Sequence, residues 1–139
     1  MRRQIAANLA GAPVPAEITG DVAEALHQPD ASFGAVVLTQ VLCTVGDPDR
    51  ALGEARRVLR PGGRLIVLEH IRGSGSLARC QDRLTPLWSR LITGCHLDRD
   101  TAAAVEGAGF TIHRAELFDP FPRGVPARPM PQAIAVPAP

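Results

Sequence analysis

The sequence lacks a charge excess of either sign. Its 139 residues carry 15 basic and 14 acidic side chains, which gives a formal net charge of +1. Proteins that follow the phosphates of a nucleic acid need a basic patch or stripe, and here the two signs are interspersed along the chain. We therefore expect no nucleic-acid partner.

Paired cysteines are also absent. Cys43, Cys80 and Cys95 lie far apart and form no C-x-x-C motif, so their spacing predicts neither a disulfide framework nor a metal site. Although His96 follows Cys95, the pair lacks the further ligands that a metal needs. We expect Cys43 and Cys95 to be core residues with reduced thiols, as in a cytoplasmic protein.

Long hydrophobic runs are missing as well. No segment approaches the roughly 20 apolar residues that span a bilayer, and the opening MRRQIAANLAGAP has no apolar region of the kind that signal peptides carry. The sequence therefore predicts no membrane span. It does contain 45% hydrophobic residues, which is enough for one compact core, in a chain too short for two ordinary domains.

The centre of the chain alternates between strand and helix patterns. FGAVVLTQVL (33–42) is a nearly continuous apolar run, typical of a strand that is buried on both faces. Asp47 can cap a helix, whose apolar positions recur at helical spacing until Pro61 forbids continuation. Two glycines then allow a tight reversal into a second apolar strand, Leu65–Leu68. This order predicts a βαβ unit with parallel strands.

Weaker patterns flank this unit. Further elements are expected as a helix at Arg2–Ala10, a strand at Val14–Thr19, an apolar helical stripe from Leu77 to Leu91 bent near Pro86, a helix at Asp98–Ala108, a strand at Phe110–Phe118 and a last strand at Gln132–Val136. Trp88, Leu91 and Ile92 are expected in the core. We predict an α/β domain over residues 1–118, followed by a proline-rich tail over residues 119–139.

Open α/β sheets bind ligands in the loops that follow the carboxyl ends of their strands. One hypothesis is dinucleotide binding, because GSGSLA fits G-x-G-x-x-A at Gly73, Gly75 and Ala78. The fingerprint also requires a following strand that ends in an acid, and the segment ITGCHLDRD is not such a strand. A plain loop is therefore the better interpretation of these glycines.

A second hypothesis comes from four motifs that follow one another between residues 23 and 63. They are the A-E-x-L loop, the D-x-S-F start of the central strand, the V-L-x-x-V-x-D-P start of a capped helix and the R-V-L-R-P-G-G join. With LARCQDRLTPLWSRLITGCHLDRDT further on, the chain from Arg2 to about Val136 resembles class I S-adenosylmethionine (SAM)-dependent methyltransferases. It is similar to the ubiquinone/menaquinone-type domain, to the thiol S-methyltransferases and to bacterial proteins labelled phospholipid methyltransferases. The resemblance implies a partial Rossmann-like fold, mostly parallel, with helices on both faces.

The resemblance also implies a SAM site at two strand ends. Val22 and Ala23 match the loop that contacts adenine, and Asp21 could recognise its exocyclic amine. Thr39 matches the small hydroxyl position beneath the cofactor at the end of the central strand, and Gln40 stands beside it. The implied function is methyl transfer from SAM to a small lipophilic or thiol acceptor.

Glu69 and His70 end the second strand and are the acceptor-side candidates. They could orient an acceptor or take a thiol proton, or they could satisfy polar groups of the strand end. Methyl transfer from a sulfonium has a good neutral leaving group, so positioning can supply most of the catalysis. The catalytic residues are therefore left open, and no metal is implied.

Parts of the family pattern are missing. In this family a glycine-rich loop after the first strand receives the methionine part of the cofactor, and an acid after the second strand binds the ribose. Neither stands in the expected position here. We therefore expect an amino-terminally truncated enzyme that lacks the first two strands and is inactive alone. The alternative is a non-catalytic partner subunit, whose exposed sheet edge would permit self-association.

Overall fold

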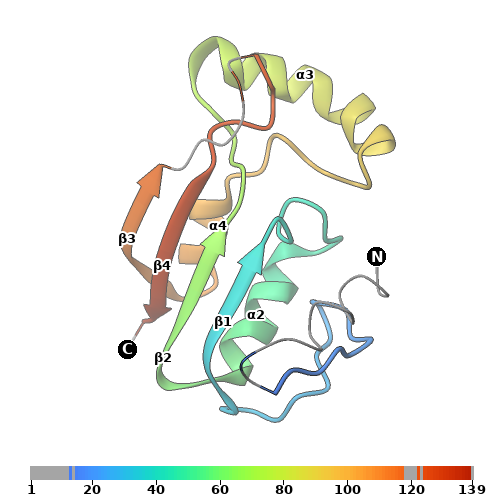
Figure 1. Cartoon of the computed structure of the whole chain (residues 1–139). Coiled ribbons are helices and arrows are strands. Elements are labelled where there is room, and N and C mark those ends of the chain that lie inside the picture. Colours follow the sequence, from blue (N-terminus) through green and yellow to red (C-terminus); the bar gives the residue numbers. More distant parts are fainter. Residues whose placement is uncertain (1–12, 14, 118–121, 123, 139) are drawn as a thin grey trace.

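Four strands and three helices make up the part of the chain that the computed structural model describes, residues 13, 15–117, 122 and 124–138 (Figure 1). The strands are β1 (Phe33–Thr39), β2 (Leu59–Leu68), β3 (Phe110–Leu117) and β4 (Pro131–Pro137). The helices are α2 (Pro48–Val58), α3 (Gly75–Leu91) and α4 (Thr101–Gly107). The helix predicted at Arg2–Ala10 lies outside the described residues.

The strands form one sheet in the order β1-β2-β4-β3. β1 and β2 are parallel, whereas β4 is antiparallel to both of its neighbours. β1, β2 and β3 therefore run in one direction, with β4 antiparallel between β2 and β3. The predicted α/β class is confirmed, but the described sheet is mixed, with one parallel and two antiparallel pairings. The strand predicted at Gln132–Val136 is present as β4, and it lies inside the sheet. The carboxyl-terminal segment is thus part of the domain's sheet and not only a tail.

The predicted βαβ unit is present, but its second strand begins earlier than predicted. α2 ends at Val58, and β2 starts directly at Leu59, which pairs with Phe33. The next pair joins Ala35 to Arg64, so the intervening Pro-Gly-Gly sequence forms a bulge within β2 instead of a turn before it. Glycine suits this position because Gly62 has a φ of +76°.

α2 and α4 contact each other and lie on the same face of the sheet (Figure 1). The core on that face consists of Leu38, Leu42, Ala51, Leu52, Ala55, Leu59, Leu65, Val67, Val105, Phe110 and Ala135. Successive strand residues point to opposite faces, and Val37, next to the buried Leu38, is 61% exposed. Among the described residues, the face that carries Val37 therefore has no packed helix, although the resemblance implied helices on both faces.

α3 differs from its prediction. It lies beyond the carboxyl ends of the parallel strands and not on a face of the sheet (Figure 1). Leu91 and Ile92 are 71% and 44% exposed, so the expectation that they belong to the core is wrong. Trp88 is partly buried and packs against the buried cluster that contains Cys43 and Cys95.

The residues that α3 buries are small or polar, which explains why the helix does not pack its apolar stripe on the sheet. Its buried residues are Ala78, Gln81 and Thr85. The Gln81 amide donates to the carbonyls of Pro126 at 2.9 Å and Arg128 at 2.7 Å, and its oxygen accepts the Gly73 N–H at 2.7 Å. α3 thus packs on irregular backbone that needs hydrogen-bond partners, and its apolar stripe points elsewhere.

The strand predicted at Val14–Thr19 is wrong over the part that the structure describes, because residues 15–20 form no strand. A strand needs a hydrogen-bonded neighbour. β1 is the end strand of the described sheet and pairs there only with β2. Residues 15–20 are therefore irregular.

Candidate functional site

Glu69 ties together the carboxyl ends of β1 and β2. Its side chain is fully buried, and its carboxylate accepts the backbone N–H groups of Val41 at 2.5 Å, Leu42 at 2.9 Å and Cys43 at 3.4 Å. The turn after β1 has amides without strand partners, and an ionised oxygen is the strongest acceptor they can find. Glu69 therefore fixes the shape of this turn.

His70, next along the chain, lies in a cluster with two cysteines. Its Nε2 is 3.0 Å from the sulfur of Cys95, which also accepts the indole N–H of Trp88 at 3.4 Å. Cys43 completes the cluster, and the ligand atoms of Cys43, His70 and Cys95 all lie within 4.8 Å of one another in the interior. The two cysteines are core residues, as predicted, but their spacing in sequence gave no sign that they meet His70.

Hydrogen bonds shift the pKa values of the two thiols in opposite directions. The hydrogen bond from the Cys43 thiol, together with those from His70 and Trp88, lowers the pKa of Cys95 below its ordinary value. The same contact and burial raise the pKa of Cys43. Cys95 is therefore the sulfur that carries negative charge more readily.

Asp21, Val22 and Ala23 form a short turn on the other side of the unit. The Asp21 carboxylate lies 2.7 Å from Nδ1 of His27, and this contact lowers the pKa of Asp21. Val22 is 59% exposed, whereas Ala23 packs on the main core. The turn thus presents an apolar side chain outward, beside a carboxylate that already has a partner.

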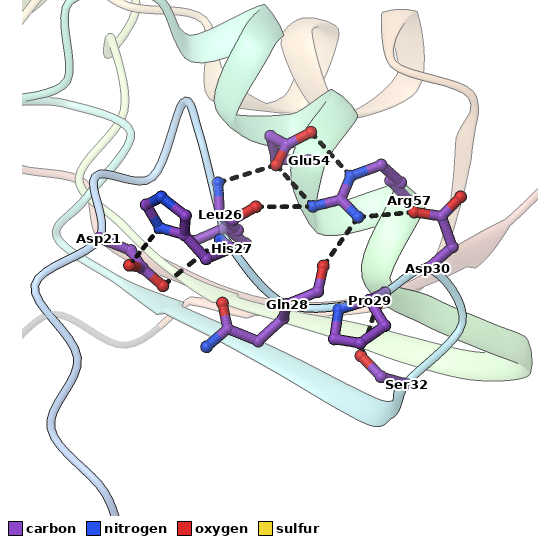
Figure 2. Close-up of polar contacts among 9 residues, drawn as sticks. All are labelled: Asp21, Leu26, His27, Gln28, Pro29, Asp30, Ser32, Glu54 and Arg57. Atoms are coloured by element: carbon purple, nitrogen blue, oxygen red, sulfur yellow. Dashed lines mark hydrogen bonds and ion pairs between the residues drawn. The ribbon is translucent and has the colours of Figure 1, made fainter.

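Arg57 and Glu54 of α2 hold the chain that follows this turn (Figure 2). The guanidinium donates to the carbonyls of Leu26 at 2.9 Å and Gln28 at 2.8 Å and to the carboxylate of Asp30 at 2.6 Å. Glu54 accepts from Arg57 at 2.8 Å and from the Leu26 N–H at 2.8 Å. Hydrogen bonds from Arg57 above all hold the pKa of Glu54 at about 2. Sequence reasoning missed this pair, which positions the predicted adenine loop.

Thr39 and Gln40 are exposed at the end of β1. Gln40 has a φ of +53°, a left-handed conformation that is uncommon for residues other than glycine and that concentrates at functional sites. Its N–H donates to the Leu68 carbonyl at 3.0 Å. A cavity of about 230 Å³ includes Asp21 in its lining but neither Thr39 nor Gln40.

The residues predicted to bind SAM could contact one side of its adenosine part. Exposed Val22 can supply an apolar surface, and Thr39 and Gln40 can supply uncharged hydrogen-bonding groups. These residues do not line a common cavity among those found in the described part of the chain. The fit to the cofactor is therefore partial.

A larger hollow lies beside α3. Its volume is about 530 Å³, and its lining includes Leu77, Leu84, Leu117, Val125 and Pro129. Most of this surface is apolar, as is usual for pockets that take small organic molecules. It is separate from the turn that carries Asp21.

The dinucleotide hypothesis finds no support in the loop before α3. The Gly73 N–H is already used by Gln81, and a Cβ on Gly73 would lie 2.7 Å from Leu77. Close packing on α3 therefore accounts for this glycine without a phosphate. The plain-loop interpretation agrees with these contacts.

Comparisons with known proteins agree with the resemblance. Residues 1–67 match the methyltransferase domain family. Thiol S-methyltransferase TMT1B of Rattus norvegicus is 40% identical over 102 residues, which cover 72% of this chain and 42% of that protein. Ubiquinone/menaquinone biosynthesis C-methyltransferase UbiE of Hahella chejuensis is 60% identical over 47 residues, which cover 34% of this chain and 19% of that protein.

Solved structures share the fold. A SAM-dependent methyltransferase of Methanosarcina mazei aligns with a TM-score of 0.65 at 20% identity, over 98% of this chain and 76% of that chain. One from Mesorhizobium loti aligns with a TM-score of 0.64 at 21% identity, over 96% and 75%. The described fold therefore matches a large part of the Rossmann-like fold of these two structures.

Fold and sequence matches together define the class as an α/β methyltransferase. The chain belongs to the class I SAM-dependent methyltransferase family, in which SAM is the cofactor. It spans 42% of the length of the rat thiol S-methyltransferase that it matches. Within the described residues, no helix has the length and apolar character needed to cross a membrane.

Proposed function

We propose that this chain contributes to methyl transfer from SAM to a small thiol or lipophilic acceptor. The observation that carries the proposal is the 40% identity to a thiol S-methyltransferase over 102 residues. That match is long enough to extend beyond the cofactor-side strands into the segment around α3. The apolar hollow of about 530 Å³ beside α3 supports an acceptor with a hydrophobic part.

SAM would supply an activated methyl group on a sulfonium. We assign the adenosine side to Asp21, Val22 and Ala23, and the end of β1 to Thr39 and Gln40. Glu69 acts as a positioning residue, because it fixes the turn that follows Gln40. His70 is the candidate for handling an acceptor proton, since a thiol is a better nucleophile after it loses its proton.

The isolated chain is expected to bind SAM weakly and to be inactive. Val22, Thr39 and Gln40 are exposed, and this assignment gives the methionine part of SAM no charged partner. Each missing hydrogen bond to a charged group costs about 1.5 to 3 kcal/mol of binding free energy. Two such losses would raise the dissociation constant by about two to four powers of ten.

A chimera tests the proposed reaction. The amino-terminal part of rat thiol S-methyltransferase TMT1B is placed before residues 13–139, and methylation of dithiothreitol by SAM is followed by mass spectrometry. The chimera should form the methyl thioether, whereas the 139-residue chain should not. Thr39→Trp should abolish the product by filling the donor side, and Thr111→Trp, at an exposed position of β3, should not.

Two results would contradict the proposal. A folded chimera that binds SAM but methylates no thiol or lipophilic alcohol would show that the proposed class of acceptor is wrong. Normal SAM affinity in the Thr39→Trp variant of the chimera would show that the end of β1 does not contact the cofactor.

A second candidate is a partner subunit without catalysis. It is favoured by the open face of the sheet, on which Val37 is 61% exposed, and by the position of β1 at the end of the described strand order. Exposed strand edges and apolar faces pair readily with other chains. Sedimentation of the 139-residue chain tests this role: a concentration-dependent dimer supports it, and a monomer at all concentrations counts against it.

A further inference from the structure

Three side chains that bind soft metals meet inside the domain. Cys43 follows β1, His70 follows β2, and Cys95 lies in the loop between α3 and α4. One ligand atom from each lies within 4.8 Å of the other two. All three residues are buried, with exposures between 2% and 6%.

Backbone contacts hold these residues in place. The His96 N–H donates to the Cys43 carbonyl at 2.8 Å, and the Cys95 N–H donates to the Ile92 carbonyl at 2.8 Å. The Cys43 N–H faces the Glu69 carboxylate at 3.4 Å. The three ligands therefore come from three separate segments but share a fixed geometry, which is what a preformed metal site requires.

The donor set is specific in its chemistry. Two thiolates and one imidazole favour zinc among the common divalent cations, and two cysteines with one histidine form a known three-ligand zinc set that leaves a fourth position open. Zinc binds sulfur at about 2.3 Å and nitrogen at about 2.0 Å, so tetrahedral ligand atoms lie about 3.5 to 3.8 Å apart. Atoms that already lie within 4.8 Å of one another need only small side-chain movements to reach this spacing.

The orientation of the His70 ring also fits a metal site. Nε2 lies 3.0 Å from the Cys95 sulfur, the contact expected when a proton takes the place of a metal between two ligands. Nε2 is therefore the nitrogen that would bind the metal. Nδ1 is buried and has no hydrogen-bond partner among the described residues, so it would carry the proton of a neutral, metal-bound imidazole.

We propose that Cys43, His70 and Cys95 form a zinc site that fastens the loop after α3 to the carboxyl ends of β1 and β2. The fourth position is taken by water or another small ligand. The zinc site and the acceptor-proton role proposed above for His70 exclude each other, because the ring nitrogen that faces the Cys95 sulfur would bind the metal. Bound zinc is expected to stabilise the packing of the loop after α3 at this edge of the sheet.

Cobalt(II) binding to the reduced 139-residue chain tests the site. We expect one cobalt ion per chain, with thiolate charge-transfer absorption and the visible bands of a tetrahedral ion, displaced by one equivalent of zinc. Cys43→Ser and Cys95→Ser should each weaken zinc binding by more than about 100-fold, beyond the loss typical of an outer-shell change. Cys80→Ser is the matched control, because Cys80 is exposed on α3, and it should bind zinc like the parent chain.

A second measurement covers variants that fail to fold. In the parent chain, zinc should slow alkylation of Cys43 and Cys95 in mild denaturant at least tenfold and leave Cys80 unchanged, as read by mass spectrometry of peptides. Equal alkylation of all three cysteines with and without zinc would overturn the proposal. So would a cobalt spectrum that is the same in Cys43→Ser, Cys95→Ser and the parent chain.

Discussion

The backbone N–H of Leu42 donates to the Glu69 carboxylate at 2.9 Å, across 27 residues of sequence. This bond joins the turn after β1 to the end of β2, at the edge where ligands of α/β sheets bind. Both residues are buried, so the carboxylate serves the backbone and does not face solvent. The end of β1 that carries Thr39 and Gln40 therefore depends on an acid of the neighbouring strand.

Glu69→Gln should destabilise the domain. The amide keeps one acceptor oxygen but turns an NH₂ group toward a backbone donor, which leaves a buried N–H without a partner at a cost of about 2 kcal/mol. Urea unfolding should show a lower midpoint with an unchanged slope. Glu106→Gln, at an exposed position of α4, should change the free energy of unfolding by less than about 0.5 kcal/mol. Equal stability of the two variants would mean that Glu69 does not hold the turn.

Arg57→Lys should loosen the chain between Asp21 and Asp30. Lysine cannot reproduce the planar set of donors that reaches two carbonyls and two carboxylates at once. We expect the amide of Leu26 to exchange its hydrogen at least about tenfold faster, because local opening becomes easier. Arg83→Lys, at an exposed position of α3, serves as the control. Unchanged exchange at Leu26 would show that other contacts hold the loop.

The ion pair of Glu54 predicts how stability changes with pH. Its pKa is about 2 in the folded chain and 4.5 in the reference state. Because the folded value is the lower one, the contribution of Glu54 is complete above pH 4.5 and is lost as pH falls toward 2. The difference in unfolding free energy between the parent chain and Glu54→Gln should therefore shrink over this interval. A difference that stays constant from neutral pH down to pH 2 would contradict the assignment.

Gln81→Leu should disconnect α3 from the segment before β4. The substitution leaves the Gly73 N–H and the carbonyls of Pro126 and Arg128 without this side-chain partner. A loss of about 2 kcal/mol is expected, and thermal unfolding by circular dichroism measures it. Gln132→Leu, exposed on β4, should have a much smaller effect. If both variants unfold at the same temperature, the buried amide is not what holds α3.

Local sequence patterns predicted the centre of this fold well. The cap of α2 is decided by neighbours in sequence, and the Asp47 carboxylate accepts the Arg50 N–H at 3.0 Å. The apolar run predicted β1 as a strand, but the prediction that this strand is buried on both faces is wrong. β1 is the end strand of the described sheet, and Val37 is 61% exposed. The early start of β2 was missed because Pro-Gly-Gly is a usual turn signal, whereas parallel pairing with β1 draws Leu59 into the sheet. The resemblance to methyltransferases supplied the family, which composition and periodicity alone did not.

Long-range contacts account for what the sequence did not reveal. The apolar stripe of α3 has helical spacing, but its burial depends on whether the helix meets the sheet, and here Gln81 directs it to other backbone. Cys43, His70 and Cys95 are separated by 25 residues or more, so spacing rules for metal sites do not apply to them. The clamp of Arg57 on Leu26 likewise spans 31 residues.

Titration of the ¹⁵N-labelled 139-residue chain with SAM tests the central claim most directly, because amide shifts detect even millimolar binding. We predict that shifts concentrate at Asp21, Val22, Ala23, Thr39 and Gln40, and that the amides of Gly73 and Gly75 do not move. Absence of any shift at several millimolar SAM would contradict the assignment of the donor side. Shifts confined to the loop before α3 would contradict it too, and would restore the dinucleotide hypothesis.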